Sequence, residues 1–272
     1  MNCPYGTSTP PKQQTKKTSL GYRTVRCSTC RRTFHERTGT PFTFLEYLTA
    51  IVLLVVLWRL QYKLSLRDLA EMLLERGLEF THEAVREWEA RFAPLLADHL
   101  RARRRGQAGR SWYVDETYVN VKGKGCDLYR AIDRDGNLVD SMVSEKRDIE
   151  AAKCFFKQAV EVVDHAPERV TTDGHHASPR AIRETLGSDV LQRTNRSLTH
   201  RLEQDHRGIQ QRHSPMRGLG SFTSASHLCR AFDEVRQFFG VRSALKQKIS
   251  LAEQREMVRQ RLDAWKAMVA IA

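Results

Sequence analysis

The chain has 272 residues, 40% of them hydrophobic, and carries 45 basic against 32 acidic residues, for a formal net charge of +13. This length and apolar content allow a buried core, which argues against a disordered protein, and the positive charge favours a polyanionic partner. The basic excess is uneven, because residues 1–110 hold 19 basic and 10 acidic side chains whereas residues 111–272 hold 26 and 22. We expect one domain of enzymatic size with a smaller appendage.

Cysteines are sparse, and no cleavable signal with a basic start and an apolar core opens the chain. Six cysteines are too few for a disulfide scaffold of this length. We therefore expect a reducing, cytoplasmic setting. The cysteines are Cys3, Cys27, Cys30, Cys126, Cys154 and Cys229.

The N-terminal segment contains a possible metal knuckle. Residues 1–20 are rich in Pro, Ser, Thr and Lys and show no apolar period, so their order must come from elsewhere. Cys27 and Cys30 form a C-x-x-C knuckle between strand-like residues 22–25 and 31–34. This arrangement is typical of a small zinc ribbon.

A second, incomplete knuckle opens the chain at Cys3. We predict a zinc-ribbon-like segment over residues 1–40, in which Cys3, Cys27 and Cys30 hold Zn²⁺ and His35 is a candidate fourth ligand. The alternative is a degenerate ribbon that packing alone holds together.

An apolar run of 12 residues, 47–58, follows. A membrane span needs about 20 residues, so we expect a buried helix here. Ser65 then caps a helix over 65–74, Gly77 breaks the pattern, and Thr81 caps a second helix over 81–92.

Two capped helices joined by a short break predict a helix-turn-helix domain over residues 41–105, and the alternative is a plain helical hairpin in a core. The basic stretch after the second helix favours DNA as the ligand. The residues of this part expected to contact DNA are Thr81, His82, Arg86, Arg103, Arg104 and Arg105.

From Ser111 the pattern alternates instead of following a helical period. Three strands joined by short glycine turns predict an antiparallel meander, and alternating helices and strands follow, which together predict a mixed five-stranded α/β sheet. The expected strands are 111–122, 128–132, 138–143, 169–172 and 190–194. The expected helices are 149–163, 178–186, 198–213, 221–239 and 251–271.

Three acidic residues of this part are candidates for metal binding. Asp115 lies in mid-strand among large apolar residues, where a carboxylate is costly unless it is coordinated or paired. Asp173 ends a strand before Gly174, and Glu203 lies on a helix. Such carboxylates suit two Mg²⁺ ions, since this cation prefers oxygen ligands and leaves room for phosphate and water.

Each acid also has a structural alternative. Asp115 would pair with a neighbouring arginine, Asp173 would cap the following turn, and Glu203 would be a solvated helix residue. Asp205 is the second choice for the role of Glu203, because it faces another side of the helix.

Several sequence blocks in order carry a resemblance over residues 60–240. They are VDETYV (114–119), LYRAID (128–133), KRD (146–148), TTDG (171–174), EQDHR (203–207) and PMRG (215–218). The chain resembles the DDE transposases of bacterial insertion sequences, and most closely the cointegrate-forming family numbered six.

This resemblance implies a ribonuclease H-like catalytic domain over residues 106–240, followed by a C-terminal helix in 241–272. It implies that Asp115, Asp173 and Glu203 are catalytic and hold two Mg²⁺ or Mn²⁺ ions. Arg207 and Arg212 are then expected to contact DNA.

The implied reaction cuts DNA at the terminal inverted repeats of an insertion sequence and joins the freed 3′-hydroxyl to target DNA. The implied setting is the bacterial cytoplasm, in association with the nucleoid. Because two element ends must be paired, we expect a homodimer or larger assembly on DNA, and no membrane partner.

Some positions depart from the family pattern. Only 29 residues separate Asp173 from Glu203, Thr199 and His200 stand where the family tends to have two asparagines, and Gln210 replaces a lysine. A catalytically impaired transposase remnant is therefore one alternative, and a helix-turn-helix regulator is another. A tyrosine recombinase is excluded, because all seven tyrosines lie at or before Tyr129, ahead of the H-x-x-R box at 227–230.

Overall fold

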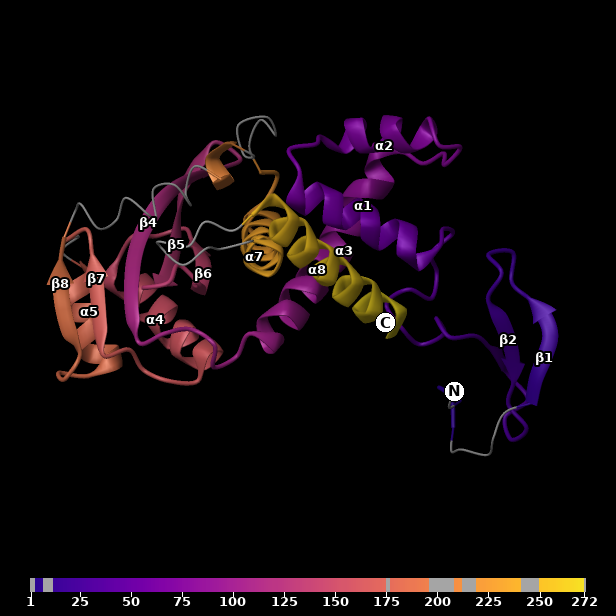
Figure 1. Ribbon diagram of the computed structural model, residues 1–272, viewed down its shortest axis with the longest axis horizontal. Coiled ribbons are helices and arrows are strands. Elements are labelled where there is room, and N and C mark those ends of the chain that lie inside the picture. Colours follow the sequence, from indigo (N-terminus) through magenta and orange to yellow (C-terminus); the bar gives the residue numbers. More distant parts are fainter. Residues whose placement is uncertain are drawn as a thin grey trace. The chain divides into compact units, whose positions relative to one another are not determined.

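The computed structural model describes residues 3–6, 12–174, 177–195, 208–211, 219–240 and 250–271. Contacts divide the chain into two units, one made of Met1–Val55 with Arg255–Ala272 and the other of Val56–Gln254. Figure 1 labels the helices and strands of the chain. The second unit holds both the helix pair expected to bind DNA and the five-stranded sheet. The finer four-part division expected from the sequence remains a prediction.

The first unit begins with a small antiparallel sheet in the order β1-β2-β3. β2 (Arg23–Arg26) and β3 (Thr33–Phe34) are the two strands predicted around the cysteine knuckle, and Val25 pairs with Phe34. β1 (Lys12–Lys17) is a strand that the apolar pattern does not predict. Its order comes from backbone pairing with β2, which needs no apolar side chains.

The structure confirms the buried helix that the apolar run predicts. This helix is α1 (Thr49–Gln61), in which Val52, Val55 and Val56 are completely buried. The predicted C-terminal helix is α8 (Leu251–Ile271). Within the described part of the chain, no helix is long and apolar enough to cross a membrane.

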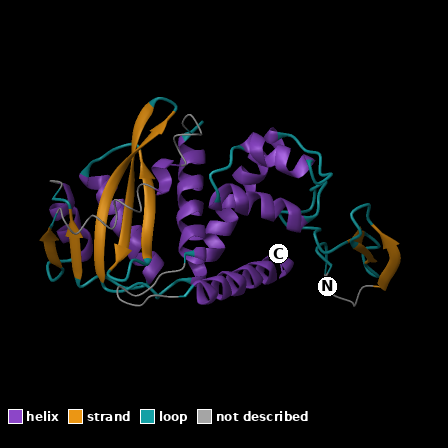
Figure 2. Ribbon diagram, turned by 45° about the horizontal axis from the view of Figure 1, so that its top comes forward, coloured by secondary structure: helices purple, strands orange, loops and turns teal. Residues whose placement is uncertain are grey.

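Two capped helices follow α1, as predicted (Figure 2). α2 (Leu66–Leu74) begins at Ser65, whose hydroxyl accepts from the Asp68 N–H while the Asp68 carboxylate accepts from the Ser65 N–H, a capping box. α3 (His82–Arg103) begins at Thr81, whose hydroxyl accepts from the backbone of the first turn. α2 packs against α3.

α3 is longer than the sequence pattern indicates. Its predicted end was Phe92, but it continues through Pro94 to Arg103. Buried Ala93, Ala97 and Leu100 extend the apolar stripe of the helix beyond the proline, and this burial favours the additional turns.

The sheet of the second unit has the strand order β6-β5-β4-β7-β8. β4, β5 and β6 form the predicted antiparallel meander, whereas β7 lies parallel to β4 and β8 parallel to β7, so the mixed five-stranded α/β sheet is confirmed. The strands are β4 (Ser111–Val121), β5 (Lys124–Asp133), β6 (Leu138–Ser144), β7 (Arg169–Thr172) and β8 (Leu191–Thr194).

Helices cover both faces of this sheet. α4 (Ile149–Val163) and α5 (Ala177–Leu186) pack on the face to which Trp112 of β4 points. α7 (Phe222–Phe239) packs on the face to which Val119 of β4 points. Since side chains alternate along a strand, even-numbered residues of β4 lie on the α4 side and odd-numbered residues on the α7 side.

A buried ion network fastens the end of α3 to the sheet and to α7. Arg101 donates to Asp140 of β6 over 2.8 Å, and Arg104 donates to both carboxylate oxygens of Glu234 over 2.7 and 2.6 Å. Arg104 also donates to two backbone carbonyls of β6, each over 2.9 Å. The C-terminal end of α3 is therefore part of the packed core of the sheet domain.

Candidate active site

The register of the sheet brings two predicted acids opposite each other. β4 and β7 run parallel, and Tyr113 pairs with Thr171. Asp115 lies two residues further along β4, and Asp173 lies two residues after Thr171, directly beyond the end of β7. The prediction that Asp173 directly follows its strand is confirmed, since β7 ends at Thr172.

The turn after Asp173 requires a glycine. Gly174 has φ +97°, in the left-handed region that favours this residue. A Cβ built there would lie 2.7 Å from Cγ2 of Thr194 in β8, which is closer than real Cβ atoms come. Gly174 thus lets the chain turn away at the point where the Asp173 carboxylate leaves the sheet.

A third acid, Glu116, joins this pair. One carboxylate oxygen from each of Asp115, Glu116 and Asp173 lies within 4.8 Å of the other two. The Glu116 N–H also donates to Asp115 Oδ1 over 3.0 Å. The sequence pattern does not predict Glu116, because strand alternation places the side chains of neighbouring residues on opposite faces of a sheet. The available signal was that Glu116 directly follows Asp115 in the sequence.

Arg147 contacts two of the three carboxylates. Its Nη2 lies 3.2 Å from Glu116 Oε2 and 3.9 Å from Asp173 Oδ2. Burial raises the pKa of Glu116 to about 7, with Arg147 opposing the rise and Asp173 adding to it. The Arg147 guanidinium therefore places a positive charge beside these acids.

The third predicted acid, Glu203, lies outside the described residues, as do Asp205, Arg207 and Arg212. The described helical segment 208–211 lies against β4 on the face of Asp115. There Gln210 Nε2 donates to Thr117 Oγ1 over 3.1 Å, and Ile209 is buried with Val119.

The residues at the start of α3 that we expect to contact DNA are partly exposed. Thr81 is the N-cap, and Arg86 forms an exposed ion pair with Glu83 over 2.7 Å. His82 Nε2 lies 3.2 Å from the same glutamate. These contacts leave their role in DNA binding as a prediction.

In the basic stretch at the C-terminal end of α3, the prediction for Arg104 is wrong. Its side chain is only 8% exposed and is bonded to Glu234, so it is not available to a DNA phosphate. The neighbouring Arg103 and Arg105 are exposed, and Arg105 pairs with Asp164 over 2.9 Å. The helical period explains the difference, because Arg104 lies three and seven residues after the buried positions 101 and 97.

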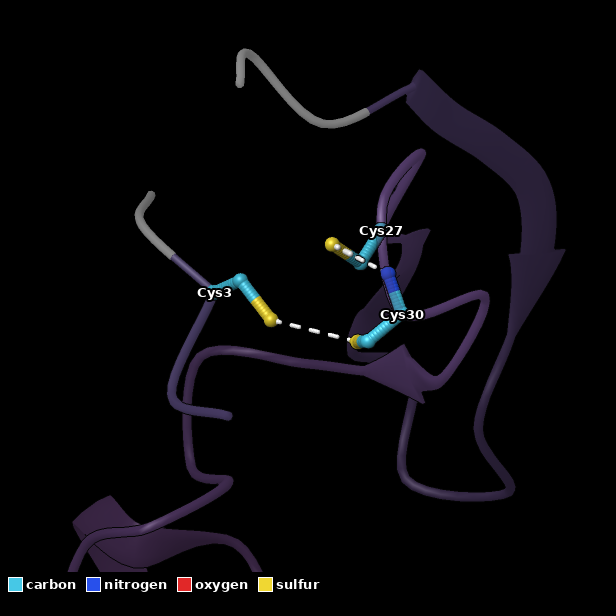
Figure 3. A group of neighbouring side chains, drawn as sticks. All are labelled: Cys3, Cys27 and Cys30. Atoms are coloured by element: carbon cyan, nitrogen blue, oxygen red, sulfur yellow. Dashed lines mark hydrogen bonds between the residues drawn. The ribbon is translucent and has the colours of Figure 1, made fainter. Parts of the chain in front are cut away.

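The three predicted thiol ligands form a group of their own. The sulfur atoms of Cys3, Cys27 and Cys30 lie within 4.8 Å of one another, and Figure 3 shows the side chains facing one another. Cys3 Sγ lies 3.6 Å from Cys30 Sγ. The Cys30 N–H donates to Cys27 Sγ over 3.5 Å and, as the largest cause, lowers the pKa of the Cys27 thiol to about 7.

His35 does not join this group of described ligands. Its Nδ1 accepts from the Arg37 N–H over 3.2 Å, and its ring stacks on Tyr22 with a centroid distance of 6.0 Å. Among the residues that the structure describes, the thiol group therefore offers three ligands and no histidine.

Comparisons with known proteins identify the family of this chain. A family model described as a DDE domain matches residues 109–240. The transposase for insertion sequence-like element IS431mec of Staphylococcus aureus is 32% identical over 175 residues, which are 63% of this chain and 77% of that protein. The transposase for insertion sequence element IS257 in transposon Tn4003, also from S. aureus, is 31% identical with the same coverage.

One solved structure, the HTLV-2 integrase catalytic core domain in complex with magnesium (trimeric form), has a TM-score of 0.36 and 14% identity over 55% of this chain and 95% of that one. The matched domain contains Asp115 and Asp173, and the chain covers more than three quarters of the S. aureus transposase. The chain belongs to the DDE transposases of bacterial insertion sequences.

Proposed function

We propose that this transposase cuts and joins DNA with Asp115, Asp173 and Glu203, which hold two divalent ions, Mg²⁺ or Mn²⁺. The substrates are the terminal inverted repeats of its insertion sequence and the target DNA. When bound, the ions would activate water and then the 3′-hydroxyl, and offset the charge that develops on the phosphate.

One observation carries this proposal: Asp115 on β4 and Asp173, which directly follows the neighbouring parallel strand β7, have carboxylate oxygens within 4.8 Å of each other. Hard cations such as Mg²⁺ prefer such oxygen ligands, and two-metal sites place their ions about 4 Å apart, so the residues fit the ions. A DNA-binding regulator has no need of this cluster.

The role of Glu203 is supported by the segment that follows it. The described residues 208–211 contact Thr117 and Val119, which point to the same face of β4 as Asp115. A helix over 198–213, as the sequence predicts, would bring Glu203 toward that face.

We propose that the sheet domain is ribonuclease H-like. Its support is the order β6-β5-β4-β7-β8, in which an antiparallel meander is extended by two parallel strands through α4 and α5. In this topology the C-terminal end of β7 lies beside the middle of β4, where the two acids lie.

We also propose that α2 and α3 are a helix-turn-helix, with Thr81, His82 and Arg86 in the major groove and Arg103 and Arg105 on phosphates. The position of Thr81, His82 and Arg86 at the exposed start of α3 supports this proposal. Pairing of two element ends implies a dimer or larger assembly on DNA, which would work at the bacterial nucleoid in the cytoplasm.

A cleavage assay on DNA that carries the ends of the insertion sequence tests this function. With Mg²⁺ or Mn²⁺ the wild type is expected to nick at the element end, and a chelator to abolish nicking. Glu203→Gln is expected to lose about 1,000-fold in rate, because a metal-binding carboxylate contributes several kcal/mol to catalysis. Gel analysis of end-labelled DNA measures the rate.

Asp205→Asn is the matched control and is expected to cut at the wild-type rate. Equal cutting by Glu203→Gln and the wild type would assign the third ligand to another residue. A wild type that binds the ends but cuts with neither ion would instead identify a catalytically impaired copy.

We propose that Cys3, Cys27 and Cys30 hold a structural Zn²⁺. Three converging thiols, one of them with a pKa of about 7, suit this ion, because the thiolate is the form that binds it. The purified chain is expected to contain zinc by plasma mass spectrometry, and Cys27→Ser to lose it. Cys154→Ser, which changes an exposed cysteine outside the group, is expected to keep it. A wild type without zinc would support a ribbon held by packing alone.

A further inference from the structure

Arg147 extends from a loop that is fixed on both sides. Before it, Ser144 Oγ accepts from the Lys146 N–H over 3.2 Å and donates to the Lys146 carbonyl over 2.8 Å. After it, the Asp148 carboxylate caps α4 by accepting from the Ala151 N–H over 2.8 Å. The Arg147 side chain therefore leaves the backbone from a defined position.

From this loop the guanidinium reaches across the sheet. Arg147 follows the edge strand β6, whereas Glu116 lies on β4, and β5 runs between these two strands. Neighbouring strands are about 4.8 Å apart, so the loop after β6, the Arg147 side chain and the Glu116 side chain together bridge the roughly 10 Å between β6 and β4. Ordering a long side chain in this way costs conformational entropy, and its contacts with the acids must offset that cost.

The two contacts of Arg147 differ in character. Glu116 is 5% exposed and holds Nη2 at 3.2 Å, while Asp173 is 34% exposed and lies 3.9 Å away. Arg147 itself is 39% exposed, so part of its guanidinium remains open to solvent beside the cluster. The shorter contact, with buried Glu116, therefore holds the guanidinium in place. The longer contact, with Asp173, is weak enough for the guanidinium to give it up for another partner.

The charges of the three acids and of Arg147 indicate what this arrangement does. Three carboxylates within 4.8 Å repel one another, and a guanidinium remains protonated under all ordinary conditions. A divalent ion between Asp115 and Asp173 would take over the neutralisation of these acids. It would also repel the guanidinium from Asp173, while the planar N–H donors of arginine match a phosphate as well as a carboxylate.

We propose that Arg147 is the counter-ion of this carboxylate cluster before metal binds, and that it passes from Asp173 to a DNA phosphate once metal is bound. The proposal rests on the proposed metal-binding role of Asp115 and Asp173. Glu116 holds the guanidinium in both states and is a positioning residue, because it acts through Arg147.

Mn²⁺ titration of the full chain without DNA, followed by electron paramagnetic resonance, tests the first state. Arg147→Gln is expected to bind Mn²⁺ about tenfold more tightly, because a positive charge close to the ion is removed. Arg147→Lys keeps the charge and is expected to bind as the wild type does. Arg180→Gln, which changes an exposed arginine paired with Glu184, is the matched surface control.

Cleavage of element-end DNA at saturating Mn²⁺ tests the second state. Arg147→Gln is expected to cut about 100-fold more slowly in spite of its tighter metal binding, because a donor to the reacting phosphate is lost. Arg147→Lys is expected to recover part of this rate, and Arg180→Gln to cut normally. A merely structural role would instead weaken metal binding and cleavage together.

Unchanged or weaker Mn²⁺ binding by Arg147→Gln would overturn the counter-ion role, and unchanged cleavage would overturn the transfer to phosphate. Neither result would touch the metal site itself. If the wild type binds no Mn²⁺, or if Asp115→Asn binds it equally well, the proposed metal site fails and this inference fails with it.

Discussion

Asp115→Asn and Asp173→Asn are each expected to slow DNA cleavage by about 1,000-fold or more, because each removes a charged metal ligand that contributes several kcal/mol to transition-state stabilisation. Asparagine keeps the size of the side chain but loses its charge. Single-turnover cleavage of end-labelled DNA measures the effect, and Mn²⁺ titration is expected to show weakened binding in both variants.

A surface variant of the same chemistry provides the control. Asp135→Asn changes an exposed aspartate in the turn between β5 and β6 and is expected to cut at the wild-type rate. Binding of element-end DNA by the two site variants is expected to remain, since their change does not touch the helix pair. Wild-type cutting by either Asp115→Asn or Asp173→Asn would refute its proposed role.

Arg104→Met is expected to lower the free energy of unfolding by about 3–5 kcal/mol, because it leaves the buried Glu234 carboxylate without its partner. Glu234 is 2% exposed and receives two hydrogen bonds from Arg104, and Asp140, at 1%, lies 4.0 Å from it. The two backbone carbonyls of β6 also lose their side-chain donor. Urea unfolding followed by circular dichroism measures the loss.

Arg105→Met separates this effect from the general loss of an arginine. Its side chain is 63% exposed and pairs with an exposed Asp164, and such pairs contribute about 1 kcal/mol or less. Adding Glu234→Leu to Arg104→Met is expected to recover stability, because the uncompensated buried charge is then removed. Equal stability of the Arg104 and Arg105 variants would contradict the assigned role of the network.

The positions of Asp115 and Asp173 follow from sequence because local signals determine them. The alternation after Ser111 defines β4, and the glycine at 174 marks the end of β7. Once both strands are placed in one parallel pair, their register brings the acids together. The family resemblance names the same two residues, so pattern and resemblance agree at this site.

Contacts that depend on tertiary packing could not be predicted in this way. Glu116 belongs to the opposite face of β4 by alternation, and Arg147 reaches it from a loop beyond β6, which no local pattern encodes. The basic run around Arg104 predicts a DNA contact, but the structure buries its side chain. Its spacing from Ala97 and Arg101 was the available signal that it continues the buried stripe of α3.

The length of α3 has a consequence for where an element end is read. A helix of this length, 22 residues, is about 33 Å long, which is close to one turn of B-DNA. Its C-terminal end is fastened to β6 and α7 by Arg101 and Arg104. If Thr81, His82 and Arg86 contact base pairs, α3 is a rigid connection to the sheet domain. Its length then fixes the distance between the recognised sequence and the phosphate that is cut.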